Sequence, residues 1–380
     1  MRTEITIPVR PWYKDHCFGG RIILAAVEAM QLLATTAKAA YPDLDVRNMQ
    51  AGRFAKLLEI PPEAARLDAA VELERGEKGE VCARLLTRTQ LKTLTRMTTH
   101  CELTFAAEAA HDKGAENGTA GPCTGAGMEV SAEEVYRDLV PFGPAYRTLQ
   151  DRLFLDAEFA WGTLWAPKLE QSATHPLGSP FPLDGAMHAA CVHGQRLVDF
   201  IPFPVGFAER HITKPTRAGE RYRTQVHLHA CTSEELVYNL RIFDQKEQVR
   251  ETVKGLRMRD VSGGRIRPPG WIKKTLKGQT AAPSRVDLAA DVGGLFRYSP
   301  DQAAFHDHPG KPAAEDQRID RAGKIHAQQK NQMGKTVNQR TADHHNPRGL
   351  QLERKQPQNG DGRPAEQKAE ADGKDPGQYL

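Results

Sequence analysis

The sequence has no excess of charge of one sign. Its 380 residues include 52 lysines and arginines against 48 aspartates and glutamates, which leaves a formal net charge of +4. Aromatic residues make up only 7% of the chain, and no basic run is interleaved with them. A nucleic-acid-binding surface normally combines clustered positive charge with a suitable recognition motif. We therefore expect no nucleic-acid partner.

The chain also lacks a long apolar run and paired cysteines. Its longest apolar stretch, residues 22–34, is interrupted by Glu28 and Gln31, so it is too short to cross a bilayer and indicates a buried helix. The N-terminal residues have no apolar signal segment, and none of the six cysteines forms a CxxC motif. We expect a cytoplasmic protein with reduced thiols and no membrane contact. No GxSxG, GxGxxG or P-loop pattern points to acyl-serine hydrolysis, nucleotide binding or phosphoryl transfer.

Composition divides the chain into segments. Only eight of the seventy residues 311–380 are V, I, L, M, F, W, Y or C. Such a segment cannot bury enough apolar surface to offset the entropy of ordering, so we predict a disordered tail over 275–380. The sequence leaves open whether this tail is native or a frameshift product. A polar, glycine-rich segment over 111–127 predicts a linker between two halves, 1–110 and 128–274.

The two halves have the same order of predicted elements. Each begins with a short strand, continues with an apolar helix and ends with three strands whose apolar residues alternate. The predicted elements are strand 3–9, helix 22–40 and strands 66–74, 79–87 and 98–106 in the first half, and strand 162–166, helix 185–200 and strands 221–230, 236–243 and 252–258 in the second. A long helix wrapped by an antiparallel sheet, occurring twice, predicts an α+β double hotdog with two antiparallel sheets.

Two residues that can exchange protons precede the two predicted helices. His16 lies in the segment DHCFGG, and Asp184 lies in FPLDGAMHAAC. A single histidine there is commonly structural, and an aspartate before a helix is commonly an N-cap. In two symmetric hotdogs, however, equivalent positions point into one shared tunnel. The pair therefore predicts an acid–base site.

Four motifs in order resemble those of the polyketide synthase dehydratase family. His16, Gly20 and Ala25 match HxxxGxxxxP, with alanine in place of the proline. Asp184 and His188 match DxxxQ/H. The remaining two motifs are the PFGPAYR segment, with Phe142, Gly143, Pro144 and Tyr146, and a looser match at Phe203, Pro204, Val205, Gly206 and Phe207. The resemblance extends over about residues 5–272 and leaves the C-terminal hundred residues unmatched.

The resemblance implies a 3-hydroxyacyl-[acyl-carrier-protein] dehydratase, a hydro-lyase that forms 2-enoyl products in polyketide or fatty-acid-like biosynthesis. His16 would be the general base and Asp184 the general acid, supported by His188 and Gly20. A carboxyl group needs an apolar surround to keep its proton at neutral pH. The glycine pair at 19–20, before a helix expected from Ile22, would let backbone N–H groups stabilise the enolate-like oxygen. Phe142, Gly143, Pro144, Tyr146, Phe203 and Pro204 would line the substrate tunnel.

The resemblance also implies partners. The substrate would arrive on the phosphopantetheine arm of an acyl carrier protein, with other synthase components nearby, and the reaction needs no metal or organic cofactor. Arg21, Arg210, Lys214 and Arg217 would offer the acidic carrier a cationic surface. A homodimer is possible.

Three alternatives stay open. The same fold and residue pair suit a product-template-like cyclase or an enoyl isomerase, and a non-catalytic acyl-binding scaffold is the third. Substrate chain length, stereochemistry and oligomeric state do not follow from the sequence.

Overall fold

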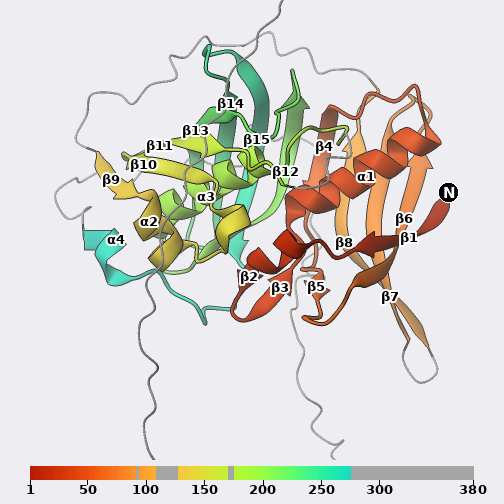
Figure 1. Ribbon diagram of the computed structural model, residues 1–380, viewed down its shortest axis with the longest axis horizontal. Helices are drawn as coiled ribbons and strands as arrows, with labels where there is room; N and C mark the ends of the chain where they lie inside the picture. The colour runs from red at the N-terminus through yellow and green to blue at the C-terminus, as the bar shows by residue number, and fades with distance from the viewer. Residues whose placement is uncertain (91–93, 108–126, 170–174, 275–380) are drawn as a thin grey trace, which may run out of the picture. The chain divides into compact units, whose positions relative to one another are not determined.

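A computed structural model of the chain describes residues 1–90, 94–107, 127–169 and 175–274. The predicted tail and all but Gly127 of the predicted linker lie outside these described residues. Within them, antiparallel strands form one 12-stranded sheet, in the order β1-β6-β7-β8-β4-β12-β15-β14-β13-β11-β10-β9. The helices α1 (Ala26–Ala40) and α3 (Phe181–Gln195) are the two long ones in this part of the chain (Figure 1).

The first half supplies five neighbouring strands and a small separate sheet. The strands are β1 (Arg2–Pro8), β4 (Asn48–Arg53), β6 (Arg66–Arg75), β7 (Val81–Gln90) and β8 (Thr95–Phe105), and the small sheet has β2 (Cys17–Phe18), β3 (Arg21–Ile23) and β5 (Glu59–Ile60). Helix α1 packs against β6, β7 and β8. Its core face includes Met30, Leu33 and Ala34, which are fully buried, as an apolar stripe with helical spacing requires.

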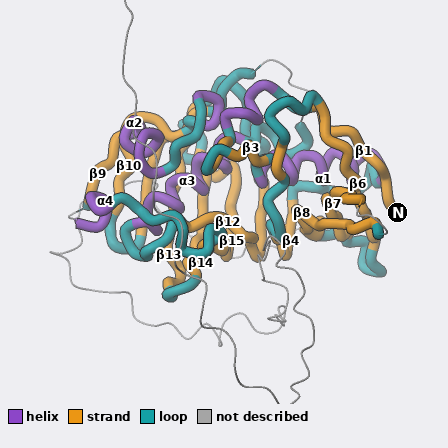
Figure 2. Tube along the Cα trace, turned by 90° about the horizontal axis from the view of Figure 1, so that it is seen from below, coloured by secondary structure: helices purple, strands orange, loops and turns teal. Residues whose placement is uncertain are grey.

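The second half supplies the other seven strands. These are β9 (Met128–Ser131), β10 (Leu149–Leu155), β11 (Phe159–Trp165), β12 (Pro202–Ile212), β13 (Arg221–Cys231), β14 (Glu235–Phe243) and β15 (Val249–Asp260). Short helical segments are η1 (Pro11–Asp15), α2 (Ala132–Glu134), η2 (Val135–Leu139), η3 (Pro144–Tyr146) and α4 (Gly270–Lys274). Helix α3 is buried along its whole length and packs against five of these strands. Figure 2 shows α1 and α3 on the same side of the strands.

The two halves are joined edge to edge. Strand β4 pairs with β12, with Phe207 opposite Gly52 and Arg210 opposite Met49. A Cβ at Gly52 would lie 2.2 Å from the Phe207 ring, so glycine is required for this close approach. Arg210 is buried and its Nε lies 2.7 Å from Oε1 of the buried Glu251. The double hotdog is thus confirmed, with its two sheets hydrogen-bonded into one.

The predicted strands are confirmed with small shifts of their ends, but both helices begin elsewhere. Residues 22–23, expected to start the first helix, belong instead to β3, which pairs with Cys17–Phe18 in a hairpin. The second helix begins at Phe181 and ends at Gln195, not at 185 and 200. Asp184 therefore lies within the first turn of α3, and its N–H bonds the Pro180 carbonyl as a helical one does. It is not an N-cap.

Candidate active site

His16 lies at the base of a hairpin that fixes the orientation of its ring. The turn is made by Gly19 and Gly20, whose φ angles of 58° and 78° favour glycine. At the base, the Ile23 N–H donates to the His16 carbonyl at 3.0 Å, and the His16 Nδ1 lies 2.8 Å from the Ile23 carbonyl oxygen. A carbonyl oxygen can only accept, so Nδ1 carries the proton and the neutral ring keeps its lone pair on Nε2.

Aromatic rings surround the His16 imidazole. The Phe142 and Tyr146 rings lie 4.3 and 4.9 Å from it, centroid to centroid. Burial among these rings lowers the His16 pKa from its ordinary value of 6.5, and the nearby Asp184 carboxylate opposes this shift. The net lowering keeps the imidazole neutral at neutral pH. The Asp184 contribution also places the two side chains within electrostatic range of each other, although they come from different halves.

Asp184 and His188 lie one turn apart on α3 and face each other. Both are buried, and His188 Nε2 is 2.9 Å from Asp184 Oδ2. The atoms are close but not aligned for a hydrogen bond, as is common for acid–base groups without bound substrate. The Phe142 ring, 5.2 Å from the His188 ring, connects this pair to His16.

Tyr136 holds the other side of the His188 ring. Its hydroxyl accepts the Leu149 N–H at 2.7 Å and lies 3.3 Å from His188 Nδ1. Because the hydroxyl already accepts from the backbone, its own proton is available for Nδ1, which leaves the Nε2 proton facing Asp184. Nothing in the sequence pattern pointed to Tyr136.

Asp15 connects the His16 hairpin to the FGPAY segment. Its carbonyl accepts the Gly143 N–H at 2.7 Å, and its carboxylate accepts the Ala145 N–H at 2.9 Å. A Cβ at Gly143 would lie 2.5 Å from the Asp15 carboxylate, so glycine is required there. These contacts hold Phe142 and Tyr146 beside His16. Asp15 was not among the predicted site residues, although its place next to His16 was a signal.

A second buried carboxyl group belongs to the same cluster. Glu28, in the first turn of α1, is 4% exposed, and its Oε1 accepts the Trp12 indole N–H at 3.3 Å. Burial raises the Glu28 pKa from 4.5 to about 7; the Trp12 hydrogen bond opposes this shift and the Asp184 charge adds to it. In the sequence, Glu28 was noted only as an interruption of an apolar stretch.

The remaining predicted site residues are near the site but differ in exposure. Gly20 is exposed in the hairpin turn, and Pro144 begins η3. The Phe203 ring lies 4.4 Å from the Phe18 ring of the same hairpin, and Pro204 follows it on β12. Their place in the lining of a substrate tunnel stays a prediction. At Ala25 the φ angle is −60°, the value that a proline would fix, so the alanine preserves the local backbone geometry.

Two expectations were wrong. The glycine pair at 19–20 is not at a helix N-terminus, because α1 begins only at Ala26; it therefore brings no helical N–H groups to the site. Arg210 cannot contribute to a cationic surface, because it is 3% exposed and paired with Glu251. Lys214 and Arg217 are exposed, and Arg21 is exposed with Glu59 nearby.

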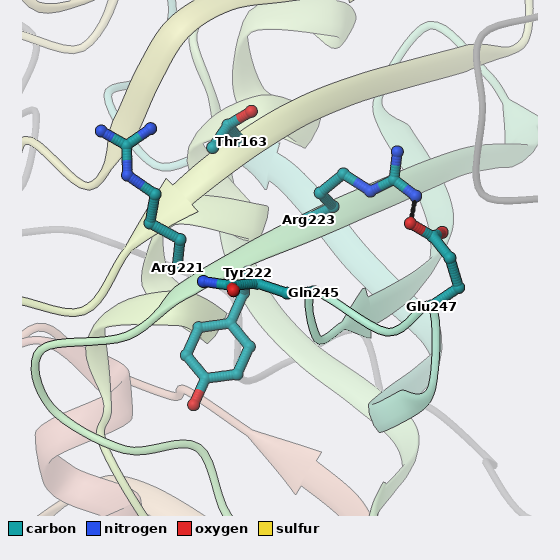
Figure 3. A pocket seen from close by; sticks show the side chains of 6 residues that line it. All are labelled: Thr163, Arg221, Tyr222, Arg223, Gln245 and Glu247. Atoms are coloured by element: carbon teal, nitrogen blue, oxygen red, sulfur yellow. Dashed lines mark ion pairs between the residues drawn. The ribbon is translucent and has the colours of Figure 1, made fainter.

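A shallow depression of about 320 Å³ lies elsewhere, on the second half. It is lined by Thr163, Arg221, Tyr222, Arg223, Gln245 and Glu247. In Figure 3, Arg221 and Arg223 extend to one side of β13 and Tyr222 to the other, as alternation along a strand requires. Arg223 is ion-paired with Glu247. The depression contains none of the predicted site residues.

Comparisons with known proteins agree with the fold and the resemblance. Residues 115–266 match a family model described as the polyketide synthase dehydratase N-terminal domain. No curated protein sequence matches the chain. Within the described residues, no helix is long and apolar enough to cross a membrane.

Solved structures similar to this chain are polyketide synthase dehydratase domains. A trans-AT dehydratase domain from Brevibacillus brevis is 15% identical with a TM-score of 0.55, over 69% of this chain and 94% of that domain. The dehydratase domain of the CurJ module of curacin polyketide synthase is 14% identical with a TM-score of 0.55, over 68% and 90%. The bifunctional dehydratase-cyclase domain of ambruticin biosynthesis is 19% identical with a TM-score of 0.53, over 68% and 91%.

Proposed function

We propose that this protein removes water from 3-hydroxyacyl thioesters to give 2-enoyl products. Two findings support the proposal: the chain resembles polyketide synthase dehydratases in sequence over residues 115–266, and it has their double-hotdog fold. The observation that carries the proposal is that the Phe142 ring lies 4.3 Å from the His16 ring and 5.2 Å from the His188 ring, which is itself beside Asp184, so residues from separate halves of the fold meet in one cluster. Elimination of water requires such a pair, one group that takes a proton and one that gives a proton.

His16 acts as the base in this proposal. Its Nδ1 proton is engaged by the Ile23 carbonyl, so the Nε2 lone pair is free to take the C2 proton of the substrate. The lowered pKa of His16 keeps this lone pair available at neutral pH. The Phe142 and Tyr146 rings pack against the His16 ring.

Asp184 acts as the acid and His188 positions it. The carboxyl group gives its proton to the departing C3 hydroxyl, which leaves as water. His188, held by the Tyr136 hydroxyl, approaches Oδ2 and leaves Oδ1 for the substrate. The proposed step conserves atoms: the C2 proton goes to His16, and the C3 hydroxyl with the Asp184 proton becomes water.

The substrate in this proposal is carried on the phosphopantetheine arm of an acyl carrier protein. Apolar rings at the site, from Phe142 and Tyr146, suit an acyl chain, and the elimination itself requires no metal or organic cofactor. Lys214 and Arg217 are exposed and remain candidates for contact with an acidic carrier. Assembly with other synthase components, and a homodimer, are further predictions.

Product analysis tests the proposal against its alternatives. The full chain is incubated with carrier proteins bearing 3-hydroxyacyl chains of several lengths, and the acyl group is analysed by intact mass and chromatography. Formation of a 2-enoyl product with loss of one water supports dehydration. A shifted double bond without water loss supports the isomerase, a ring product supports the cyclase, and binding without turnover supports the scaffold.

Two variants assign the roles. Asp184→Asn preserves the shape of the side chain but cannot give a proton, and His16→Phe preserves an aromatic ring without a base. Each should reduce turnover by at least about 100-fold, the typical size of an acid–base contribution. Thr36→Val, which alters only a side-chain hydrogen bond to the Leu32 carbonyl within α1, is the matched control. Full activity in either site variant contradicts the assigned roles.

A further inference from the structure

After elimination of water, the proposed site has gained a proton on His16 and lost one from Asp184, so it is not ready for a second turnover. After each turnover His16 carries the proton taken from C2, and Asp184 has lost the proton given to water. One proton must therefore move from His16 to Asp184 before the next turnover. This requirement rests on the proposed dehydratase function, and it calls for a group between the two residues that can carry the proton.

Glu28 is the buried carboxyl group best placed for that task. It lies in the first turn of α1, as Asp184 lies in the first turn of α3, and the two helices are in contact. The Asp184 charge acts on Glu28 directly. Glu28 is 4% exposed, so bulk water does not readily supply or remove its proton.

Tyr146 connects Glu28 with His16. Its ring is 4.9 Å from the His16 ring, and its hydroxyl faces the Glu28 carboxyl group. Within the described residues, this buried hydroxyl has no hydrogen-bond partner. A buried hydroxyl without a partner costs stability, so a hydroxyl retained at that cost is a candidate for a functional role. A phenol can accept a proton on one side and pass its own proton to the other.

The other groups near Glu28 have opposing effects on the balance between its protonated and ionised forms. Trp12 donates a hydrogen bond, Tyr13 lies close enough for Glu28 to raise the Tyr13 pKa, and the Arg10 charge favours the ionised form. Burial and the Asp184 charge favour the protonated form. The result is a carboxyl group whose pKa, about 7, allows both states at neutral pH.

We propose that Glu28 is a proton-holding positioning residue that returns a proton to Asp184 after each turnover. The Glu28 O–H bond breaks and a new O–H bond forms on the Asp184 carboxylate, which leaves Glu28 ionised. The proton on His16 Nε2 then passes by way of the Tyr146 hydroxyl to Glu28. The net change is one proton moved from His16 to Asp184, with no oxidant, reductant or co-reactant.

Single-turnover and steady-state kinetics of Glu28→Gln test this proposal. With the full chain in excess over a 3-hydroxybutyryl carrier protein, the first elimination needs no proton return, so its rate should stay within about twofold of wild type. Under steady-state conditions kcat should fall at least about tenfold, toward the lower end of acid–base effects. Wild type should also lose kcat as the pH rises above about 7, where Glu28 has no proton to give, and Glu28→Gln should lack this dependence.

Two further variants separate proton transfer from structural damage. Glu28→Asp keeps a carboxyl group and should recover part of kcat together with the pH dependence. Thr36→Val on the same helix should leave both rates unchanged.

Each remaining outcome counts against a specific claim. Equal losses in single-turnover and steady-state rates would place Glu28 in the elimination or in folding and overturn the proton-return role. If wild type turns over and Glu28→Gln has the same kcat and the same pH profile, the proton-return role of Glu28 is wrong, but the proposed dehydratase function stands. Absence of wild-type turnover on every 3-hydroxyacyl carrier protein would overturn the proposed function and this inference with it.

Discussion

Glu28→Gln should stabilise the folded protein at alkaline pH and have little effect at acidic pH. In the folded chain the Glu28 pKa is about 7, against 4.5 for the exposed group. The protonated form is thus favoured by folding, so this contribution to stability is fully present below pH 4.5 and is lost as the pH rises to about 7. Each pKa unit corresponds to about 1.4 kcal/mol. The shift therefore predicts a cost of about 3 kcal/mol above neutral pH.

Urea unfolding of wild type and Glu28→Gln, at about pH 4 and about pH 8, measures this cost by linear extrapolation. Glutamine has nearly the same shape and retains an oxygen for the Trp12 N–H, so the difference between the proteins at each pH isolates the charge. Glu28→Gln should be more stable by about 3 kcal/mol at the higher pH only. Glu133→Gln, at an exposed position, should change little at either pH. An equal difference for Glu28→Gln at both pH values would contradict the raised pKa, because it would show that Glu28 does not titrate as a buried group.

Three other measurements test separate parts of the structure. Arg210→Ala should lower the free energy of unfolding by about 3–5 kcal/mol because Glu251 is left buried without its partner, while the double replacement of Arg210 and Glu251 by methionine should recover most of this loss. Ala25→Pro should raise the free energy of unfolding by about 0.4–1 kcal/mol, since the φ angle of −60° already suits proline; a loss of stability would contradict that geometry. Because the His16 pKa is lowered from 6.5, kcat/KM should fall with decreasing pH only below pH 6.5, and an acidic midpoint above 6.5 would be inconsistent with a partly buried, neutral base.

The fold was predictable from the sequence because its pattern is local. Period-2 alternation marked strands such as residues 221–230, and apolar runs marked both long helices. The joining of the two sheets was not predictable, because β4 and β12 pair across more than half of the described chain and neither has strict alternation. The start of α1 was misplaced because residues 22 and 23 are isoleucines, whose apolar side chains suit a helix as well as a strand. Their pairing with Cys17–Phe18 decides between the two.

The candidate site was only partly predictable. Motif order brought His16, Asp184 and His188 into one hypothesis, and the structure brings their side chains into a single cluster. Glu28 and Tyr136 were missed for a physical reason. A carboxyl group within an apolar stretch, or a tyrosine before a strand, gives no sequence signal until tertiary contacts bury it beside another titrating group.

The most direct test of the central claim is the mass of a 3-hydroxyacyl group on its carrier protein, followed over time with wild type, His16→Phe and Asp184→Asn. We expect loss of the mass of one water with wild type. Each variant should stay folded and should produce this loss at a rate lower by at least about 100-fold. Loss of water at the wild-type rate in either variant would contradict the claim that these two residues, one from each hotdog, carry out the elimination together.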